Sequence, residues 1–141
     1  SDLLNYLNNI MAKIEATESG REEAIMLDAK GYVTECTGDN IFIIKDSVVY
    51  TPPLSVGILK GITRDAVIEI ARAKKISLKE RNFRREKIYA ADECFLTGTA
   101  AELIPVVRVD AKKIASGKPG PMTLLFSEEF HKMARVDGVR Y

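Results

Sequence analysis

Three short stretches of this chain carry residues whose types and spacing could do chemistry together. The first is the run Gly-Tyr-Val-Thr-Glu over residues 31–35, which places the carboxylate of Glu35 between hydrophobic segments. The other two are rich in Gly and Thr: Gly-Ile-Thr over residues 61–63 and Gly-Thr-Ala-Ala over residues 98–101. Glycine lets the backbone approach an anion, and the first amides of a helix point toward it. Together the three stretches predict a site for a phosphorylated cofactor.

The same stretches resemble the pyridoxal-phosphate transaminases of fold type IV (aminotransferase class IV), and within them the branched-chain amino-acid aminotransferases. The likeness runs over nearly the whole chain and includes Glu-Leu-Ile-Pro-Val over residues 102–106. It implies pyridoxal 5'-phosphate as cofactor, an amino acid and a 2-oxo acid as substrates, and a homo-oligomer of two or more copies. It also implies an α/β (α+β) fold, in which a mixed sheet or pseudo-barrel of short strands carries about three helices.

Pyridoxal phosphate requires an acid beside its pyridine nitrogen, donors for its phosphate and a group for the substrate carboxylate. By the resemblance, Glu35 is that acid, because an ionised carboxylate favours the protonated ring. Without that context, Glu35 would be a strand-end glutamate that faces water. Tyr6 matches a tyrosine that donates to the ring oxygen of the cofactor, and the alternative is a core tyrosine on an amphipathic helix.

The resemblance assigns the phosphate to the two Gly- and Thr-rich loops, and the substrate carboxylate to small residues beside the second. Small side chains are needed there because a larger one would cover the backbone amides. Without the resemblance, the first loop is a capped helix start and the second a tight turn between strands. The expected cofactor residues are Leu59, Gly61, Ile62, Thr63 and Thr99, and the expected substrate residues are Ala100 and Ala101.

Several neighbouring residues have smaller expected roles. Asp39 and Asn40 occupy the place of the family's Glu-Asn pair near the phosphate, with Asp39 one methylene shorter. Cys36 stands where the family usually has Gly, so its side chain either crowds the loop or packs. For Arg64 and Asp65 we expect a structural role, with bonds to nearby backbone or to each other.

The family also has a Schiff-base lysine a few residues before the Asn-Tyr pair, and that register falls on Ser1 or Asp2, or just before them. Lys13 follows Tyr6 by about two helical turns, roughly 10 Å along the axis, and matches an ordinary surface lysine. The N-terminal domain, which supplies an arginine to the phosphate, is absent too. We therefore expect residues 1–141 to be the C-terminal cofactor domain, a fragment of a longer enzyme that is inactive alone. The alternative is a short natural protein that kept the fold and lost the chemistry.

The sequence carries weaker signals for the substrate than for the cofactor. Gly-Thr-Ala-Ala-Glu over residues 98–102 favours a branched-chain enzyme, whereas Lys60 stands where many of those enzymes have Pro. The alternatives are a D-amino-acid aminotransferase or an aminodeoxychorismate lyase of the same family. A further alternative of a different class is a non-catalytic binding domain.

Composition limits the other function classes. A formal net charge of +1 over 141 residues, with no block of like charge, predicts neither nucleic-acid nor membrane binding. Apolar runs are far shorter than the roughly 20 residues of a membrane span, and no signal sequence is evident. Cys36 and Cys94 are read as free thiols, which predicts a cytoplasmic protein. His131 is expected at the surface, so we expect no metal site.

Periodicity predicts a single mixed α/β domain. The expected helices cover residues 2–18, a segment capped by Thr63, and the C-terminal segment, with a helical turn over 84–89. The expected strands cover residues 24–27, 32–35, 40–44, 48–50, 76–81, 93–97 and 103–107. A hairpin turn is expected at residues 45–47 and a loop over 110–121.

Overall fold

The computed structural model describes residues 11–16, 22–36, 39–54, 61–98 and 102–136. The strands in this part of the chain are β1 (Met11–Ala16), β2 (Glu22–Leu27), β3 (Val33–Cys36), β4 (Asn40–Lys45), β5 (Val48–Thr51), β6 (Leu78–Glu80), β7 (Glu93–Thr97), β8 (Leu103–Val109) and β9 (Lys112–Lys113). The helices are α2 (Ile62–Ala73), α3 (Arg85–Tyr89) and α4 (Pro121–Val136). The mixed α/β class expected from the sequence is confirmed.

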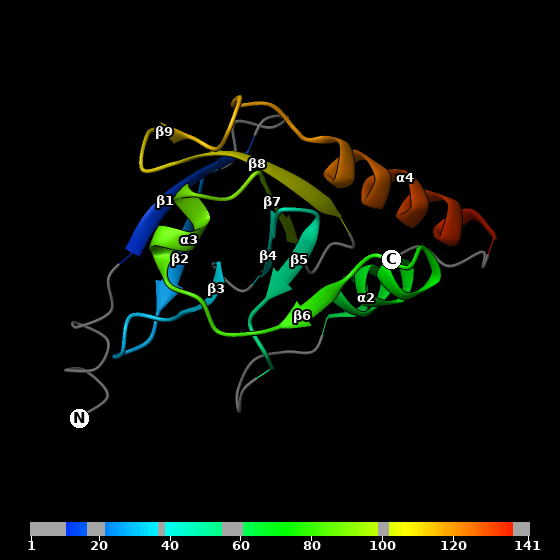
Figure 1. The fold of residues 1–141 in the computed structure, drawn as a ribbon, viewed down its shortest axis with the longest axis horizontal. Coiled ribbons are helices and arrows are strands. Elements are labelled where there is room, and N and C mark those ends of the chain that lie inside the picture. The colour runs from blue at the N-terminus through cyan, green and yellow to red at the C-terminus, as the bar shows by residue number, and fades with distance from the viewer. Residues whose placement is uncertain (1–10, 17–21, 37–38, 55–60, 99–101, 137–141) are drawn as a thin grey trace.

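The described strands form one sheet in the order β3-β2-β1-β8-β7-β4-β5-β6, with β9 paired to β8. All strand pairs are antiparallel except β5 with β6. The segment after β6 returns to β3, where the Val33 amide donates to the Phe83 carbonyl at 2.9 Å. A bridge between Tyr32 and Arg84 continues this contact, so the sheet curls into a barrel (Figure 1).

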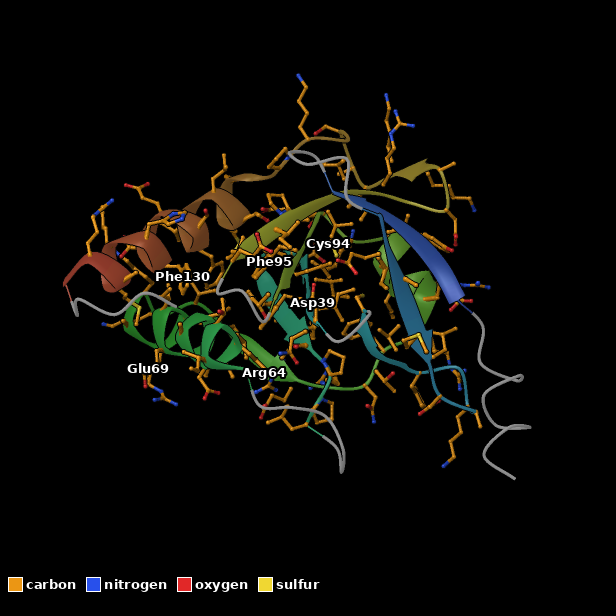
Figure 2. All side chains as sticks on the ribbon, turned by 180° about the vertical axis from the view of Figure 1, so that it is seen from behind. Asp39, Arg64, Glu69, Cys94, Phe95 and Phe130 are labelled. Carbon is orange, nitrogen blue, oxygen red and sulfur yellow. The ribbon has the colours of Figure 1, made fainter. Side chains whose placement is uncertain are left out.

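Both faces of β4 are buried, and each contributes to a different core. Ile41 and Ile43 point into the barrel, where they pack with Cys94 and Leu96 of β7 among others. Phe42 and Ile44 point outward to the layer formed by α2 and α4. Alternation with a period of two places successive side chains on opposite faces of a strand. The same rule holds for Cys94 and its neighbour Phe95, which Figure 2 labels.

Aromatic packing joins the outer face of the barrel to the two long helices. The Phe42 and Phe95 rings stack at 4.9 Å between centroids, and Phe126 of α4 lies 5.6 Å from Phe95. Phe130 lies between α2 and α4 (Figure 2) and belongs to the same core. Burial of each such side chain contributes about 1.5–3 kcal/mol. The barrel therefore fixes both helices on one side of the sheet.

The β4–β5 hairpin forms as the sequence predicts. Lys45 and Val48 pair across a two-residue turn. Asp46 and Ser47 both have positive φ, 50° and 64°, as a type I′ turn requires. Aspartate tolerates this conformation better than most residues.

Three sequence expectations are wrong, one about the type of an element and two about where elements begin or end. The described part of the predicted helix over 2–18, Met11–Ala16, is strand β1, because its backbone pairs with β2 on one side and β8 on the other. Sheet pairing overrides the helical spacing of its apolar residues. Helix α2 begins after Gly61, so Gly61 is the N-cap, and Thr63 lies inside the first turn. The predicted loop over 110–121 also contains β9.

Helix α4 takes its N-terminal cap from another element. Glu93 of β7 is 7% exposed, and its carboxylate accepts hydrogen bonds from the amides of Thr123 at 2.7 Å and Met122 at 3.3 Å. Gly120 precedes the helix because a Cβ there would overlap the Glu93 carboxylate. A negative charge at a helix N-terminus also complements the helix dipole. Glu93 thus attaches α4 to the barrel.

We predict that Glu93→Gln lowers the free energy of unfolding by about 1–2 kcal/mol, because the α4 cap loses its charge. Urea denaturation followed by circular dichroism measures the change. The control is Glu128→Gln on the exposed side of α4, where the ion pair with Lys132 is 3.5 Å long and should contribute under about 0.5 kcal/mol. Equal stability of the Glu93→Gln protein and the parent chain would contradict the capping role.

Candidate active site

Three strand ends meet the beginning of α2 at one end of the barrel. After β3, Cys36 and Asp39 exchange backbone hydrogen bonds of 2.9 and 2.7 Å, which turns the chain into β4. Asn40 then pairs with Thr97, the last residue of β7. The residue after β7 is Gly98, so the predicted Asp39-Asn40 pair lies beside the beginning of the predicted Gly-Thr-Ala-Ala loop.

Two glycines allow these segments to approach closely. A Cβ added at Gly61 would lie 3.1 Å from the side-chain nitrogen of Asn40, tighter than ordinary contacts. A Cβ at Gly98 would lie 3.4 Å from the nearer carboxylate oxygen of Asp39. The structure therefore brings together four positions that the sequence singled out in three separate stretches: Asp39, Asn40, Gly61 and Gly98.

The beginning of α2 is suited to an anion. Its N-cap, Gly61, has no side chain, so no side-chain oxygen caps the first amides. An α-helix leaves its first four amides without partners inside the helix, and its dipole favours negative charge there. Ile62 is 65% exposed at this end, while Thr63 is 2% exposed. The residues present thus fit a bound phosphate group.

Thr97 is a member of this site that sequence reasoning missed. It is 2% exposed, and its hydroxyl has no hydrogen-bond partner among the residues that the structure describes. A buried polar group without a partner is costly, so such groups mark places where a ligand or water completes the bonding. The available signal was a threonine at the end of the apolar strand Glu93–Thr97, beside Asn40 across the sheet.

Arg64 holds the beginning of α2 against the neighbouring strands. Its side chain is 2% exposed, donates to Glu80 at 2.5 Å and to the carbonyl of Pro52 at 3.4 Å, and is labelled in Figure 2. Because a buried guanidinium is costly without a partner, these bonds hold α2 to the end of β5 and to β6. The expected structural role is confirmed, with Glu80 as a partner that the sequence did not identify.

The other expected residues divide between those that the structure describes and those that it does not. Cys36 packs fully buried in the barrel, and it and Cys94 are free thiols. Burial raises the pKa of the Cys94 thiol, which keeps it protonated. His131 is exposed on α4, as expected. Tyr6, Leu59, Thr99, Ala100, Ala101 and the Glu35 side chain lie outside the described residues, and their roles stay predictions.

Two other findings concern the described residues as a whole. They contain no cluster of three or more His, Cys, Asp or Glu side chains arranged to hold a metal ion. None of the helices among them is long and apolar enough to span a membrane.

Comparison with known proteins identifies the family. A family model for class IV amino-transferases matches residues 3–109. A putative branched-chain-amino-acid aminotransferase of Methanocaldococcus jannaschii is 46% identical over 137 residues, which are 97% of this chain and 48% of that protein. The branched-chain-amino-acid aminotransferase of Pseudomonas aeruginosa is 48% identical over 118 residues, or 84% and 38% of the two chains. The chain thus spans less than half the length of these curated relatives.

Solved structures agree with the sequence match. The branched-chain amino acid aminotransferase from Escherichia coli has a TM-score of 0.75 and 43% identity, over 79% of this chain and 38% of that chain. A second branched-chain amino acid aminotransferase, solved in complex with N-(5'-phosphopyridoxyl)-L-glutamate, has a TM-score of 0.75 and 42% identity, over 81% and 38%. The resemblance inferred from three short stretches is confirmed, and the chain belongs to the class IV aminotransferase family.

Proposed function

We propose that this chain is the cofactor domain of a pyridoxal-phosphate-dependent branched-chain amino-acid aminotransferase. The whole enzyme would transfer an amino group between leucine, isoleucine or valine and 2-oxoglutarate. The observation that carries the proposal is the meeting of Asn40, Gly61 and Gly98 around the uncapped N-terminus of α2. The relatives of this chain are branched-chain aminotransferases, and a solved relative is complexed with a phosphopyridoxyl compound.

The phosphate and the ring of the cofactor have proposed contacts in the chain. The amides of Ile62 and Thr63 bind the phosphate with the Thr63 hydroxyl, because the helix dipole and the absence of a side-chain cap favour an anion there. Thr99 adds a second phosphate contact, Leu59 an apolar contact to the ring, and Tyr6 a donor to the ring oxygen. Ala100 and Ala101 present backbone amides to the substrate carboxylate.

Pyridoxal phosphate, when bound, supplies a ring that takes up the electron pair left when the α-proton of the substrate departs. Glu35 serves this chemistry by holding the proton on the pyridine nitrogen with its negative charge. The backbone of Glu35 pairs with Met26 of β2, and the next residue, Cys36, exchanges backbone hydrogen bonds with Asp39, which supports this role. The proton itself needs a base of tuned pKa at the α-carbon. We expect that base to be a lysine outside residues 1–141, together with an N-terminal domain that completes the substrate pocket.

The assembly and the compartment are part of the same proposal. We propose that the enzyme is a homo-oligomer in the cytoplasm. The free, buried thiols of Cys36 and Cys94 support the compartment, because thiols stay reduced there.

The first test is incubation of this chain with pyridoxal phosphate, followed by borohydride reduction and intact-mass analysis. We expect reversible binding, seen in the absorbance of the cofactor, and no stable adduct, because reduction traps only a lysine covalently linked to the cofactor. Glu35→Ala should weaken the binding at least about tenfold, which corresponds to about 1.4 kcal/mol. A stoichiometric adduct on one lysine within the chain would contradict the expected register of the lysine.

The second test concerns the phosphate end alone. Gly61→Val should weaken pyridoxal phosphate binding at least about tenfold, because its Cβ would crowd the Asn40 side chain, 3.1 Å away, and its methyl groups would cover the first amides of α2. Absorbance titration measures the dissociation constant. Ala73→Val, at the exposed C-terminal end of the same helix, is the matched control and should leave it unchanged. Equal weakening by both variants would mean that the helix, and not the site, is affected.

Substrate specificity is tested on the full-length enzyme. Steady-state assays with leucine, D-alanine and aminodeoxychorismate should give the highest kcat/KM with leucine. A preference for either of the other two compounds would move the protein to another branch of the same family.

A further inference from the structure

A hollow lies beside the end of β4 that is away from Asn40 and the candidate cofactor site. It has a volume of about 220 Å³. Its floor is apolar and aromatic, because Ile43 and Tyr50 pair across β4 and β5 and Phe83 follows β6. Asn40, at the beginning of β4, precedes Ile43 by three residues, or roughly 10 Å along a strand. We call this hollow the barrel-end cavity.

The rim of the barrel-end cavity is cationic. Lys45, Arg81 and Lys87 line it from β4, the segment after β6 and α3. Lys45 is paired with Asp92 at 3.5 Å, with about half of each side chain exposed. The side chains of Arg81 and Lys87 have no ion-pair or hydrogen-bond partner within the part of the chain that the structure describes. None of the described residues that line the cavity carries a carboxylate to compensate these two positive charges.

Of the polar groups near the cavity, Tyr50 adds a hydroxyl to it, whereas Arg84 is bound elsewhere. The Tyr50 hydroxyl has no hydrogen-bond partner among the described residues. Arg84 is engaged elsewhere, since it donates to the Lys30 carbonyl and lies 4.5 Å over the Tyr32 ring. Glu86 lines a more open hollow next to the cavity, and the two hollows share Asn82, Phe83 and Lys87.

We propose that the barrel-end cavity is a second ligand site, which binds a small organic carboxylate with a short apolar body. An apolar floor with a few convergent polar groups is the usual composition of a small-molecule site. If each ligand atom takes about the ~30 Å³ of a water molecule, the cavity holds roughly seven heavy atoms. The carboxylate would lie at the rim, where Arg81 and Lys87 donate charge-assisted hydrogen bonds. This site is separate from the proposed cofactor site and does not depend on it.

Titration of the isotope-labelled chain with 4-methylpentanoate, followed by two-dimensional amide NMR, tests the proposal. We expect shifts at Tyr50, at residues 81–83 and at Lys87, with Asn40, Gly61 and Gly98 unchanged. Arg81→Gln and Lys87→Gln should each raise the dissociation constant about fivefold to tenfold. Lys79→Gln, an exposed lysine of β6 outside the cavity, is the matched control and should leave it unchanged.

The neutral amide 4-methylpentanamide and inorganic phosphate separate the two halves of the site. The amide should bind at least about fivefold more weakly than the acid, because it lacks the charge that the rim recognises. Phosphate alone should cause only small shifts at the barrel-end cavity, because it has no apolar body for the floor. Shifts confined to Asn40, Gly61 and Gly98, or equal affinity in all three variants and the parent chain, would overturn the proposal. The amide shifts are assigned to individual residues, so binding at the barrel-end cavity is seen whether or not the chain binds pyridoxal phosphate.

Discussion

The burial of β4 on both faces is the constraint on which the rest of this structure depends. Ile41 and Ile43 fill the barrel while Phe42 and Ile44 hold the helices, so neither face can turn to water. A shift of one residue in the pairing of β4 with β7 would exchange the two faces and lose both cores. The register Asn40 opposite Thr97 is therefore fixed by packing some distance from the site. The site inherits its geometry from the barrel.

Core packing also sets the position of helix α2. Its buried face contributes Ala66, Val67 and Ile70 to the outer core, which sets its rotation, and Arg64 ties its first turn to the strands below. Since Gly61 brings no side chain to the N-cap, the beginning of the helix can lie against Asn40. Packing fixes the helix, and the missing side chain leaves its first amides for a ligand. A residue with a capping hydroxyl or carboxylate at position 61 would stabilise the helix and occupy the anion site at once.

Local chemistry explains which parts of the fold the sequence could predict. The β4–β5 hairpin was predictable because two apolar strands flank a short turn that contains Asp46. Met11–Ala16 was not, because apolar residues at helical spacing also fit a strand that pairs on both sides. Long-range partners left no sequence signal: Glu93 reaches amides about thirty positions later, and Arg64 reaches Glu80. Within the candidate site, short motifs singled out Asn40, Gly61 and Gly98, which the structure brings together, whereas Thr97 belonged to a strand pattern and was missed.

The two ends of the barrel offer anions different kinds of donor, and this difference follows from how the barrel is closed. At the proposed cofactor end, Gly61 and Gly98 allow close approach, and the proposed donors are backbone amides, whose positions are fixed by the helix. At the other end, the chain crosses from β6 back to β3 through Phe83, and the donors are long side chains. Backbone donors are already ordered before binding, so they suit a cofactor that stays bound; lysine and arginine side chains must be ordered by the ligand, which lowers affinity. At the two proposed sites, a carboxylate at the barrel end would accordingly exchange readily, whereas a phosphate at the helix would stay bound for longer.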